Sequence, residues 1–233
     1  MKTIIQVGHF RAAFGKKVIL KDVSFTLTDD QLVVILGENG AGKTTLVTAI
    51  LNAALSQEKT GAIQVQAENV AYVPQFRDLG ADYPLSIRSF IALGVRNYGL
   101  PWLSKSEKQH VADAIQRFDL EAIADQPIAM ASGGQKQRAY IAQAVAKQPD
   151  LLILDEPSSA LDSEHTLALV KQIRQVQQEQ KMLVLWISHD TSWVKGKADR
   201  YLWLHNQEVD LGLAKELPVA ADSTHREEVN HVF

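Results

Sequence analysis

The sequence predicts an α/β fold with a mixed sheet, an antiparallel β region at the N-terminus and an inserted α-helical subdomain. Three observations support this prediction. A continuous apolar run over 32–36 leads into a glycine-rich segment over 37–45. Similar apolar runs over 151–155 and 181–187 have the length and composition of strands buried on both faces of a largely parallel sheet. A block over about 76–131 has helical periodicity without a strand pattern, as an inserted helical lobe would.

The composition is that of an ordinary globular domain. The chain has 233 residues, of which 46% are hydrophobic and 22% charged, and its formal net charge is −3. This charge gives no general attraction for nucleic acid, so a polyanion would have to be held by local groups. The absence of cysteine excludes disulfides, thiolate nucleophiles and cysteine-ligated metals. We recognise neither a signal peptide nor an apolar run approaching the ~18 residues of a spanning helix, and therefore expect a cytoplasmic protein.

The N-terminal region is expected to be β structure, with strands over 3–7, 18–20 and 23–27 ahead of the apolar strand. Two aromatic residues, Phe10 and Phe14, stand among polar neighbours in this region. Either ring can stack on a purine base. Core packing is the commoner use of an aromatic side chain, and the pattern alone favours it.

The glycine-rich segment over 37–45, here called the phosphate loop, fits the pattern G-x-x-x-x-G-K-[ST]. Glycines let backbone N–H groups turn toward a phosphate, and the following helix adds the positive end of its dipole. Lys43 supplies a mobile charge for the outer phosphates, and the Thr44 hydroxyl can bind Mg²⁺. An isolated match also fits a plain turn beside a surface lysine, but the flanking strand and helix are the context of a nucleotide site.

Helices account for most of the next region. One helix and two short strands are expected first, over 44–55, 62–66 and 69–73. Pro74 ends the last of these strands, because proline cannot donate to a central ladder. A helix over 86–97 follows, and the capping-box match of Ser104 with Glu107 opens another that extends to Phe118.

Two further segments carry candidate functional groups. Residues 132–135, here called the signature segment, form a glycine turn ahead of a helix, which suits an anion, although a serine-capped helix start explains it equally well. The strand over 151–155 ends in the adjacent carboxylates Asp155 and Glu156. Successive strand side chains point to opposite sides, so one carboxylate can face a metal and the other a water. A solvated acidic strand end is the alternative, which the upstream phosphate loop disfavours.

The last part of the chain contributes a histidine at the same predicted sheet edge. Asp162 is expected to cap a helix over 163–179, and the strand over 181–187 runs into His189. A lone histidine at a strand end is usually structural, but parallel strands bring this one beside the carboxylates.

A small closing hairpin over 201–204 and 208–211 completes the predicted domain, which we place at 1–217. Residues 218–233 are expected to be a mobile tail. Its His225 and His231 are more simply explained as solvated than as metal ligands.

With these residues assembled, the chain resembles the ATP-binding subunit of an ABC transporter over nearly its whole length. The matches, in the family's order, are Phe14 at the base-stacking aromatic, 37–45 as Walker A, Gln75 as the Q-loop glutamine, 132–135 as the signature, 151–155 as Walker B, Glu156 as the catalytic carboxylate, 159–162 as the D-loop and His189 as the switch histidine. One position departs from the family, because Ala131 stands where the signature usually has leucine. That leucine packs rather than binds phosphate, so we expect retained function with altered local packing.

The resemblance implies an ATPase that uses ATP and Mg²⁺. By that resemblance Glu156, His189 and Gln75 are the catalytic residues, with Glu156 polarising the attacking water, and Thr44, Gln75 and Asp155 surround Mg²⁺. The implied nucleotide-binding set is Phe14, Gly37, Asn39, Gly40, Ala41, Gly42, Lys43, Thr44 and Thr45, together with Ser132, Gly133, Gly134, Gln135 and Asp162. The signature segment would contact the γ-phosphate bound to a second subunit.

The implied assembly is a homodimer with ATP between its subunits, bound peripherally to permease subunits at the cytoplasmic face of the cell membrane. A substrate-binding protein outside the cytoplasm would act indirectly, and no nucleic acid is expected as a partner. The stretches 71–75, 82–88 and 93–94 are similar to those of zinc or manganese importers. An ATPase of a siderophore or cobalamin importer, a small exporter, a soluble ABC protein acting on nucleic acid or ribosomes, and a nucleotide-binding module without turnover remain alternatives. The single cassette and net charge disfavour the nucleic-acid reading, and Glu156 disfavours the last.

Overall fold

The computed structural model describes residues 1–56, 61–75, 84–95, 102–159 and 161–221. Several predictions fall on residues outside these ranges. They concern the end of the helix predicted over 86–97, parts of the helical lobe, Ala160 of the D-loop, and the C-terminal segment 222–233 with His225 and His231.

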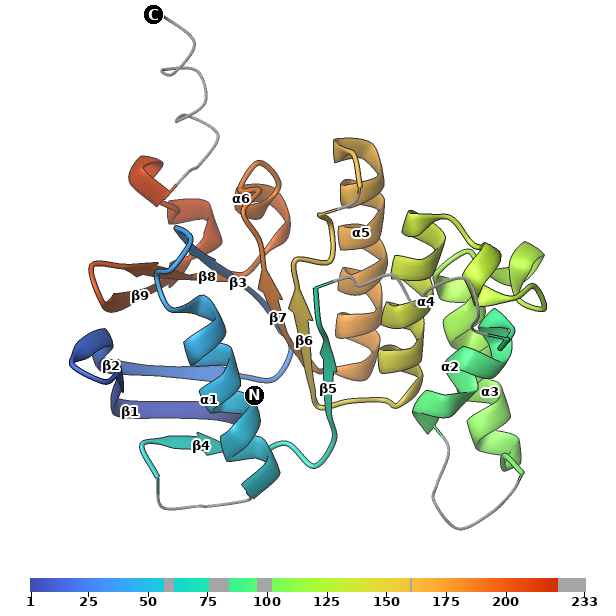
Figure 1. The fold of residues 1–233 in the computed structure, drawn as a ribbon, viewed down its shortest axis with the longest axis horizontal. Coiled ribbons are helices and arrows are strands. Elements are labelled where there is room, and N and C mark those ends of the chain that lie inside the picture. Colours follow the sequence, from blue (N-terminus) through green and yellow to red (C-terminus); the bar gives the residue numbers. More distant parts are fainter. Residues whose placement is uncertain (57–60, 76–83, 96–101, 160, 222–233) are drawn as a thin grey trace, which may run out of the picture.

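A central sheet of six strands carries the site, in the order β5-β6-β7-β3-β8-β9 (Figure 1). The strands are β3 (Gln31–Gly37), β5 (Val70–Val73), β6 (Leu151–Asp155), β7 (Leu183–Ile187), β8 (Arg200–His205) and β9 (Glu208–Leu213). All neighbouring pairs are parallel except the antiparallel pair of β8 and β9, so the predicted mixed sheet is confirmed. The predicted closing hairpin is present, but β8 also pairs with β3 and the hairpin therefore extends the central sheet.

The start of β7 corrects one predicted boundary. Lys181 was expected in this strand, but it ends the preceding helix with a left-handed φ of 53°, and the strand begins at Leu183. The apolar run begins before the strand does, because Met182 is buried but lies between the helix end and the first strand residue.

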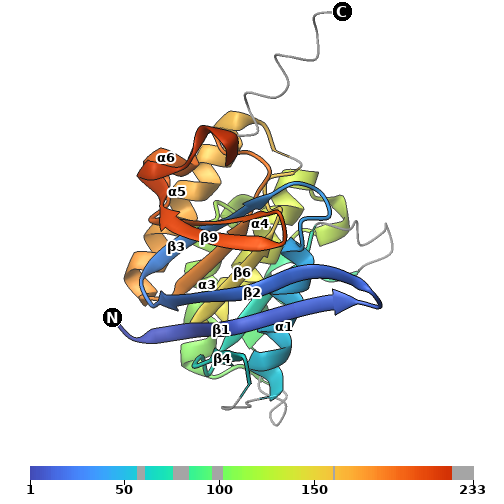
Figure 2. The same ribbon diagram turned by 90° about the vertical axis from the view of Figure 1, so that its left-hand side faces the viewer.

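A second, antiparallel sheet of three strands lies against the central one, in the order β2-β1-β4 (Figure 2). Its strands are β1 (Thr3–Phe14), β2 (Lys17–Thr28) and β4 (Ile63–Val65). The first two are longer than predicted because bulges interrupt their alternation, and His9 and Asp22 adopt positive φ angles of 52°. Phe10 packs against the core, whereas Phe14 is 88% exposed, so the core interpretation is wrong for Phe14.

The core has two layers, one on each face of the central sheet. Val33 and Ile35 of β3 point toward α1 (Lys43–Ser56) and the antiparallel sheet. Leu32 and Val34 point toward the opposite layer. Helices α4 (Gly133–Ala146) and α5 (Ser163–Gln180) cover that second face (Figure 1). The continuous apolar run of β3 is thus the consequence of burial on both faces.

The predicted helical subdomain is present in the described residues. It contains α2 (Ile87–Val95), α3 (Lys105–Arg117) and two short 3-10 turns, Glu121–Ile123 and Ile128–Met130. The capping box predicted for Ser104 and Glu107 is formed. Within 84–95 and 102–131 we find no strand beyond an isolated bridge between Ser86 and Pro127.

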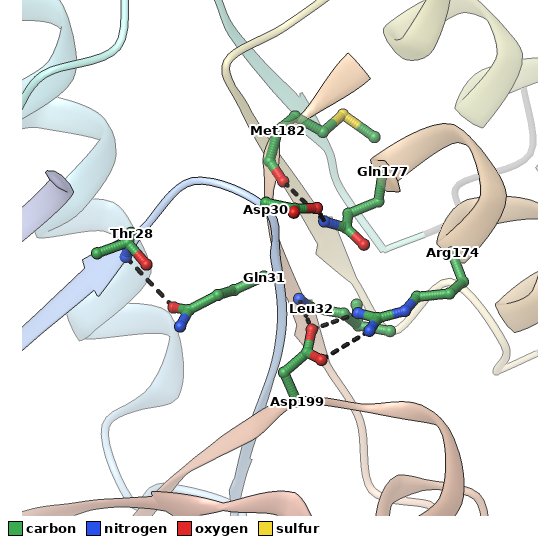
Figure 3. A network of polar contacts seen from close by, with 8 residues as sticks. All are labelled: Thr28, Asp30, Gln31, Leu32, Arg174, Gln177, Met182 and Asp199. Atoms are coloured by element: carbon green, nitrogen blue, oxygen red, sulfur yellow. Dashed lines mark hydrogen bonds and ion pairs between the residues drawn. The ribbon is translucent and has the colours of Figure 1, made fainter. Parts of the chain in front are cut away.

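A polar network ties the amino ends of the central strands together, away from the phosphate loop (Figure 3). Arg174 of α5 donates to both carboxylate oxygens of Asp199, and Asp199 Oδ2 also accepts the Leu32 N–H at 2.8 Å. Gln177 donates to Asp30 Oδ1 at 2.7 Å. The network joins α5 to the amino ends of the strands, at the edge of the sheet opposite the phosphate loop.

The last described residues lie against the body of the domain. A short helix α6 (Val194–Lys197) precedes the final two strands. Two 3-10 turns, Ala214–Glu216 and Val219–Ala221, follow them. Ala221 packs against the core, so the first residues of the predicted tail belong to the fold, and the boundary at 217 stays a prediction. None of the helices in the described part of the chain is long and apolar enough to span a membrane.

Candidate active site

The phosphate loop joins β3 to α1 at the carboxyl end of the central sheet. Gly37 has a φ of 149°, and a Cβ there would lie 2.6 Å from the Leu204 carbonyl oxygen of β8. Gly42 has a φ of 104°, a conformation that side chains rarely adopt. These two glycines let the loop turn sharply against its neighbours, so the sequence pattern reflects a steric requirement.

Lys43 is buried beneath the loop and is 8% exposed. Its Nζ donates to the carbonyl oxygens of Gly37 at 2.6 Å and Glu38 at 3.1 Å. Burial lowers the pKa of Lys43, and the negative charges of Glu156 and Asp155 oppose part of that shift. The ammonium group is therefore held inside the loop, where it can exchange carbonyl contacts for phosphate contacts.

Asp155 ends β6 and is half-buried near Lys43. The Tyr72 hydroxyl of β5 donates to Asp155 Oδ2 at 3.0 Å. Burial raises the pKa of Asp155 and Glu156 raises it further, while the Tyr72 hydrogen bond, Lys43 and His189 lower it. Burial and the Asp155 carboxylate likewise raise the pKa of Tyr72 to about 12.

Glu156 stands one residue beyond the strand and has different partners from Asp155. Its Oε1 lies 2.7 Å from His189 Nε2, and its Oε2 accepts from Gln75 Nε2 at 2.9 Å. These contacts are consistent with the prediction that Asp155 and Glu156 have different roles. The two side chains do not separate through strand alternation, because Glu156 lies beyond the strand and has a left-handed φ of 48°.

A cavity of about 550 Å³ opens in front of the phosphate loop. It is bordered by loop residues 37–41, by His189 and by the end of β8 at Trp203. Phe14 does not line this cavity, but Lys17, its partner across the β1–β2 turn, does. Thr44 is exposed at the start of α1, and Thr45 is half-buried.

The signature segment lies elsewhere in the same chain. Ser132 caps α4 through its Oγ, which accepts the Gln135 N–H, and Gln135 Oε1 accepts the Ser132 N–H at 2.8 Å. Ser132, Gly134 and Gln135 border a separate cavity of about 320 Å³ together with Asp162. Asp162 itself caps α5 as predicted, by accepting the His165 N–H at 2.9 Å.

The structure thus brings Lys43, Gln75, Asp155, Glu156 and His189 together and keeps the signature segment apart from them. Asp162 lies between the two groups, because it borders the cavity at the signature segment and also a cavity that Glu156 and His189 line. Sequence reasoning missed Tyr72. An aromatic residue in a short strand resembles any core residue, and only the pairing of β5 with β6 places its hydroxyl on Asp155.

Comparisons with known proteins agree with this geometry. Residues 20–159 match the family model described as "ABC transporter". A zinc import ATP-binding protein ZnuC from Yersinia enterocolitica is 34% identical over 229 residues, covering 97% of this chain and 84% of the relative. The ZnuC protein of Buchnera aphidicola is 30% identical and covers 88% of this chain and 82% of its own length.

Solved structures lead to the same class. One described as an ATP-binding subunit of an ABC transporter is 25% identical, has a TM-score of 0.74 and covers 91% of this chain and 90% of that chain. The fold is also that of cbiO1 from Clostridium perfringens, with a TM-score of 0.78, 24% identity and coverage of 98% and 93%.

The fold and the site define an ATP-binding cassette built on a phosphate loop. The chain belongs to the ABC transporter family. It is the ATP-binding and ATP-hydrolysing subunit that energises such a transporter.

Proposed function

We propose that two copies of this chain bind MgATP between them and hydrolyse it to drive zinc import through a membrane permease. The observation that carries this proposal is the meeting of the phosphate loop with Asp155, Glu156 and His189 at one sheet edge. The loop suits a triphosphate, and the acidic and basic side chains beside it suit phosphoryl transfer to water.

Magnesium fits the donors present at this edge. Asp155 offers a carboxylate, Thr44 an exposed hydroxyl, and Gln75 an amide oxygen whose nitrogen is already bonded to Glu156. Among the described residues, no cluster of three or more acidic or histidine side chains could hold a metal alone. The ion would therefore complete its shell with phosphate oxygens and water, which is how Mg²⁺ usually binds. When bound, it supplies positive charge that offsets the charge of the phosphates.

Hydrolysis would use the Glu156 carboxylate as the group that accepts the proton of water. His189 and Gln75 hold one oxygen each, and each carboxylate oxygen has a further lone pair for a water. The water oxygen would form a bond to the γ-phosphorus while the bond between that phosphorus and the ADP oxygen breaks. Phosphate and ADP would leave, and the proton would pass to Glu156. Lys43 would remain on the outer phosphates, where charge develops.

A second copy would complete the site. The signature segment borders a cavity of its own and does not line the cavity at the phosphate loop of its own chain. Ser132 and the N-terminus of α4 are exposed to solvent and suited to an anion that another subunit presents. Asp162 lies beside them and would join the same interface.

A groove of about 700 Å³ between β5 and the helical subdomain suits the permease. Tyr72, Val73 and Pro74 border it on the sheet side, and Leu93 and Tyr140 border it on the helical side. Leu93 is 45% exposed, an apolar contact available to a partner. The groove adjoins Gln75, so a permease segment seated there at the cytoplasmic face of the membrane would sense the state of the nucleotide site.

Zinc is proposed as the cargo because the curated relatives are zinc import ATP-binding proteins. In this proposal an extracytoplasmic binding protein delivers the ion to the permease, and the ATPase never touches it. The test is uptake of zinc, manganese and cobalamin by cells that carry the Lys43→Ala variant. Loss of zinc uptake alone is the expected result. Loss of manganese or cobalamin uptake instead would show that the transported substrate is not zinc, and the assignment of the chain as a transporter ATPase would stand.

Hydrolysis is tested with the Glu156→Gln variant. It should bind ATP normally and lose turnover by about 10²–10⁴-fold, the usual contribution of a positioned base. Glu164→Gln, an exposed change in the first turn of α5, is the matched control and should keep normal turnover. Normal phosphate release by Glu156→Gln would place the base elsewhere.

Dimerisation is tested with Ser132→Arg, which fills the exposed signature segment with a bulky cation. Sedimentation with ATP and without Mg²⁺ should show a dimer for wild type and a nucleotide-bound monomer for this variant. Ser104→Arg removes the equivalent serine of the other capping box and controls for the loss of a helix cap. A Ser132→Arg protein that still pairs with ATP would contradict the proposed interface.

A further inference from the structure

We propose that Tyr72 is a positioning residue for Asp155 and links this carboxylate to the groove beside the helical subdomain. The inference rests on the proposed function, because it assigns a role to Tyr72 in holding the Mg²⁺ of that same site. It concerns a side chain that would touch neither ATP nor the metal.

Strand pairing puts Tyr72 within reach of Asp155. β5 is the edge strand of the central sheet, and its register pairs Tyr72 with Ile153 and Val73 with Leu154 of β6. The Tyr72 side chain reaches forward along β6, and its hydroxyl lies 3.0 Å from Asp155 Oδ2. Lys43 and His189 act on the same carboxylate through their charges.

The Tyr72 hydrogen bond restricts the orientation of the Asp155 carboxylate. The terminal torsion of an aspartate is broad, so a carboxylate without a partner can rotate freely. The Tyr72 hydrogen bond occupies one oxygen and leaves the other for a cation. Groups that orient a metal ligand in this way commonly contribute 10–100-fold to metal affinity or activity.

The other end of the contact lies in the groove. Tyr72 is 39% exposed and borders the groove together with Val73 and Pro74. Gln75, three residues further along the chain, donates to Glu156. The end of β5 therefore holds both adjacent carboxylates, so a partner seated in the groove would move Asp155 and Glu156 together. The same end of this strand would then contact the partner and orient the groups of the metal and water sites.

A purely structural role predicts a different outcome from a positioning role. A hydrogen bond at a partly exposed site adds little to stability, and the Tyr72→Phe variant keeps the ring in the groove. A structural role would lower the melting temperature and weaken ATP binding with or without metal. A positioning role weakens only what depends on Mg²⁺.

The experiment compares wild type, Tyr72→Phe and Tyr201→Phe. Tyr201 lies in β8 of the same sheet, on the far side of β3 from the carboxylates, and controls for loss of a hydroxyl. For Tyr72→Phe we expect about a tenfold rise in the Mg²⁺ concentration that gives half-maximal ATPase rate. Affinity for ATP in EDTA and the melting temperature should match wild type. Electron paramagnetic resonance should show about tenfold weaker Mn²⁺ binding to the protein loaded with a non-hydrolysable ATP analogue.

Each outcome decides between the two roles. An unchanged Mg²⁺ requirement and unchanged Mn²⁺ binding in Tyr72→Phe would overturn the inference and leave the proposed function intact. An equal loss of ATP affinity in EDTA would also overturn it, because the effect would then be on the fold or on the nucleotide. A wild-type protein that neither hydrolyses ATP with Mg²⁺ nor binds Mn²⁺ when loaded with the ATP analogue would overturn the proposed function and the inference together.

Discussion

Replacing Lys43 with alanine tests the buried cation on which the nucleotide site depends. In the structure its ammonium group already donates to two carbonyl oxygens of the loop, at 2.6 Å and 3.1 Å, so it is preorganised for two acceptors. Two hydrogen bonds to charged phosphate oxygens at about 1.5–3 kcal/mol each give about 3–6 kcal/mol. Since ~1.4 kcal/mol corresponds to a factor of ten, ATP affinity should fall about 10²–10⁴-fold.

Stability should change much less than affinity. The variant loses the two carbonyl contacts but also removes an ammonium group whose pKa burial lowers, so the two effects oppose one another. Titration calorimetry with ATP gives the affinity, and thermal melting gives the stability. Lys147→Ala is the control, because Lys147 also donates to a backbone carbonyl, that of Val70, at 3.2 Å. Near-normal ATP affinity for Lys43→Ala would refute the assignment of the loop.

Three further predictions test other parts of the structure. Arg174→Ala should lower the free energy of unfolding by about 2 kcal/mol, which is less than for a fully buried ion pair because Asp199 is 31% exposed. The melting temperature should fall by about 4–8 °C while ATP affinity stays unchanged, and a normal melting curve would show that the network does not stabilise the fold. The pKa of Asp155 is raised in the fold, so the ionised Asp155 destabilises the protein increasingly as pH rises above 3.8. Asp155→Asn should therefore have a higher melting temperature than wild type at neutral pH, and the difference should shrink toward pH 3.8. A difference that stays the same at all pH values would contradict this reasoning. Phe14→Ala should weaken ATP binding by about 1–3 kcal/mol in calorimetry without lowering the melting temperature, since the ring is 88% exposed, and equal affinity would exclude base stacking.

Several features could be predicted because local sequence decides them. The capping box at Ser104 depends on residues three apart and formed as predicted. The buried strands were recognised from continuous apolar runs, because burial on both faces removes the alternation. The sequence pattern misplaces a boundary where a left-handed residue stands next to an apolar run, as at Lys181.

Other features depend on contacts between distant segments. The length of β1 could not be predicted, because bulges against β2 break its alternation. The pattern around Phe14 favours core packing, but its position at the end of a hairpin leaves the ring exposed. The contact between Tyr72 and Asp155 joins residues of neighbouring strands that are far apart in the chain.

The functional groups of this protein can be read from local sequence, because the phosphate loop, the paired carboxylates and the histidine are each short patterns at the ends of buried strands. The contacts between these groups follow from the packing of the strands and could not be read from the sequence. The parallel order of β5, β6, β7 and β3 brings Lys43, Asp155 and Glu156 to one edge, and the pairing of β5 with β6 gives Asp155 its tyrosine partner. Hydrogen bonds and charges act over a few ångströms in space, whereas sequence patterns describe only neighbours along the chain.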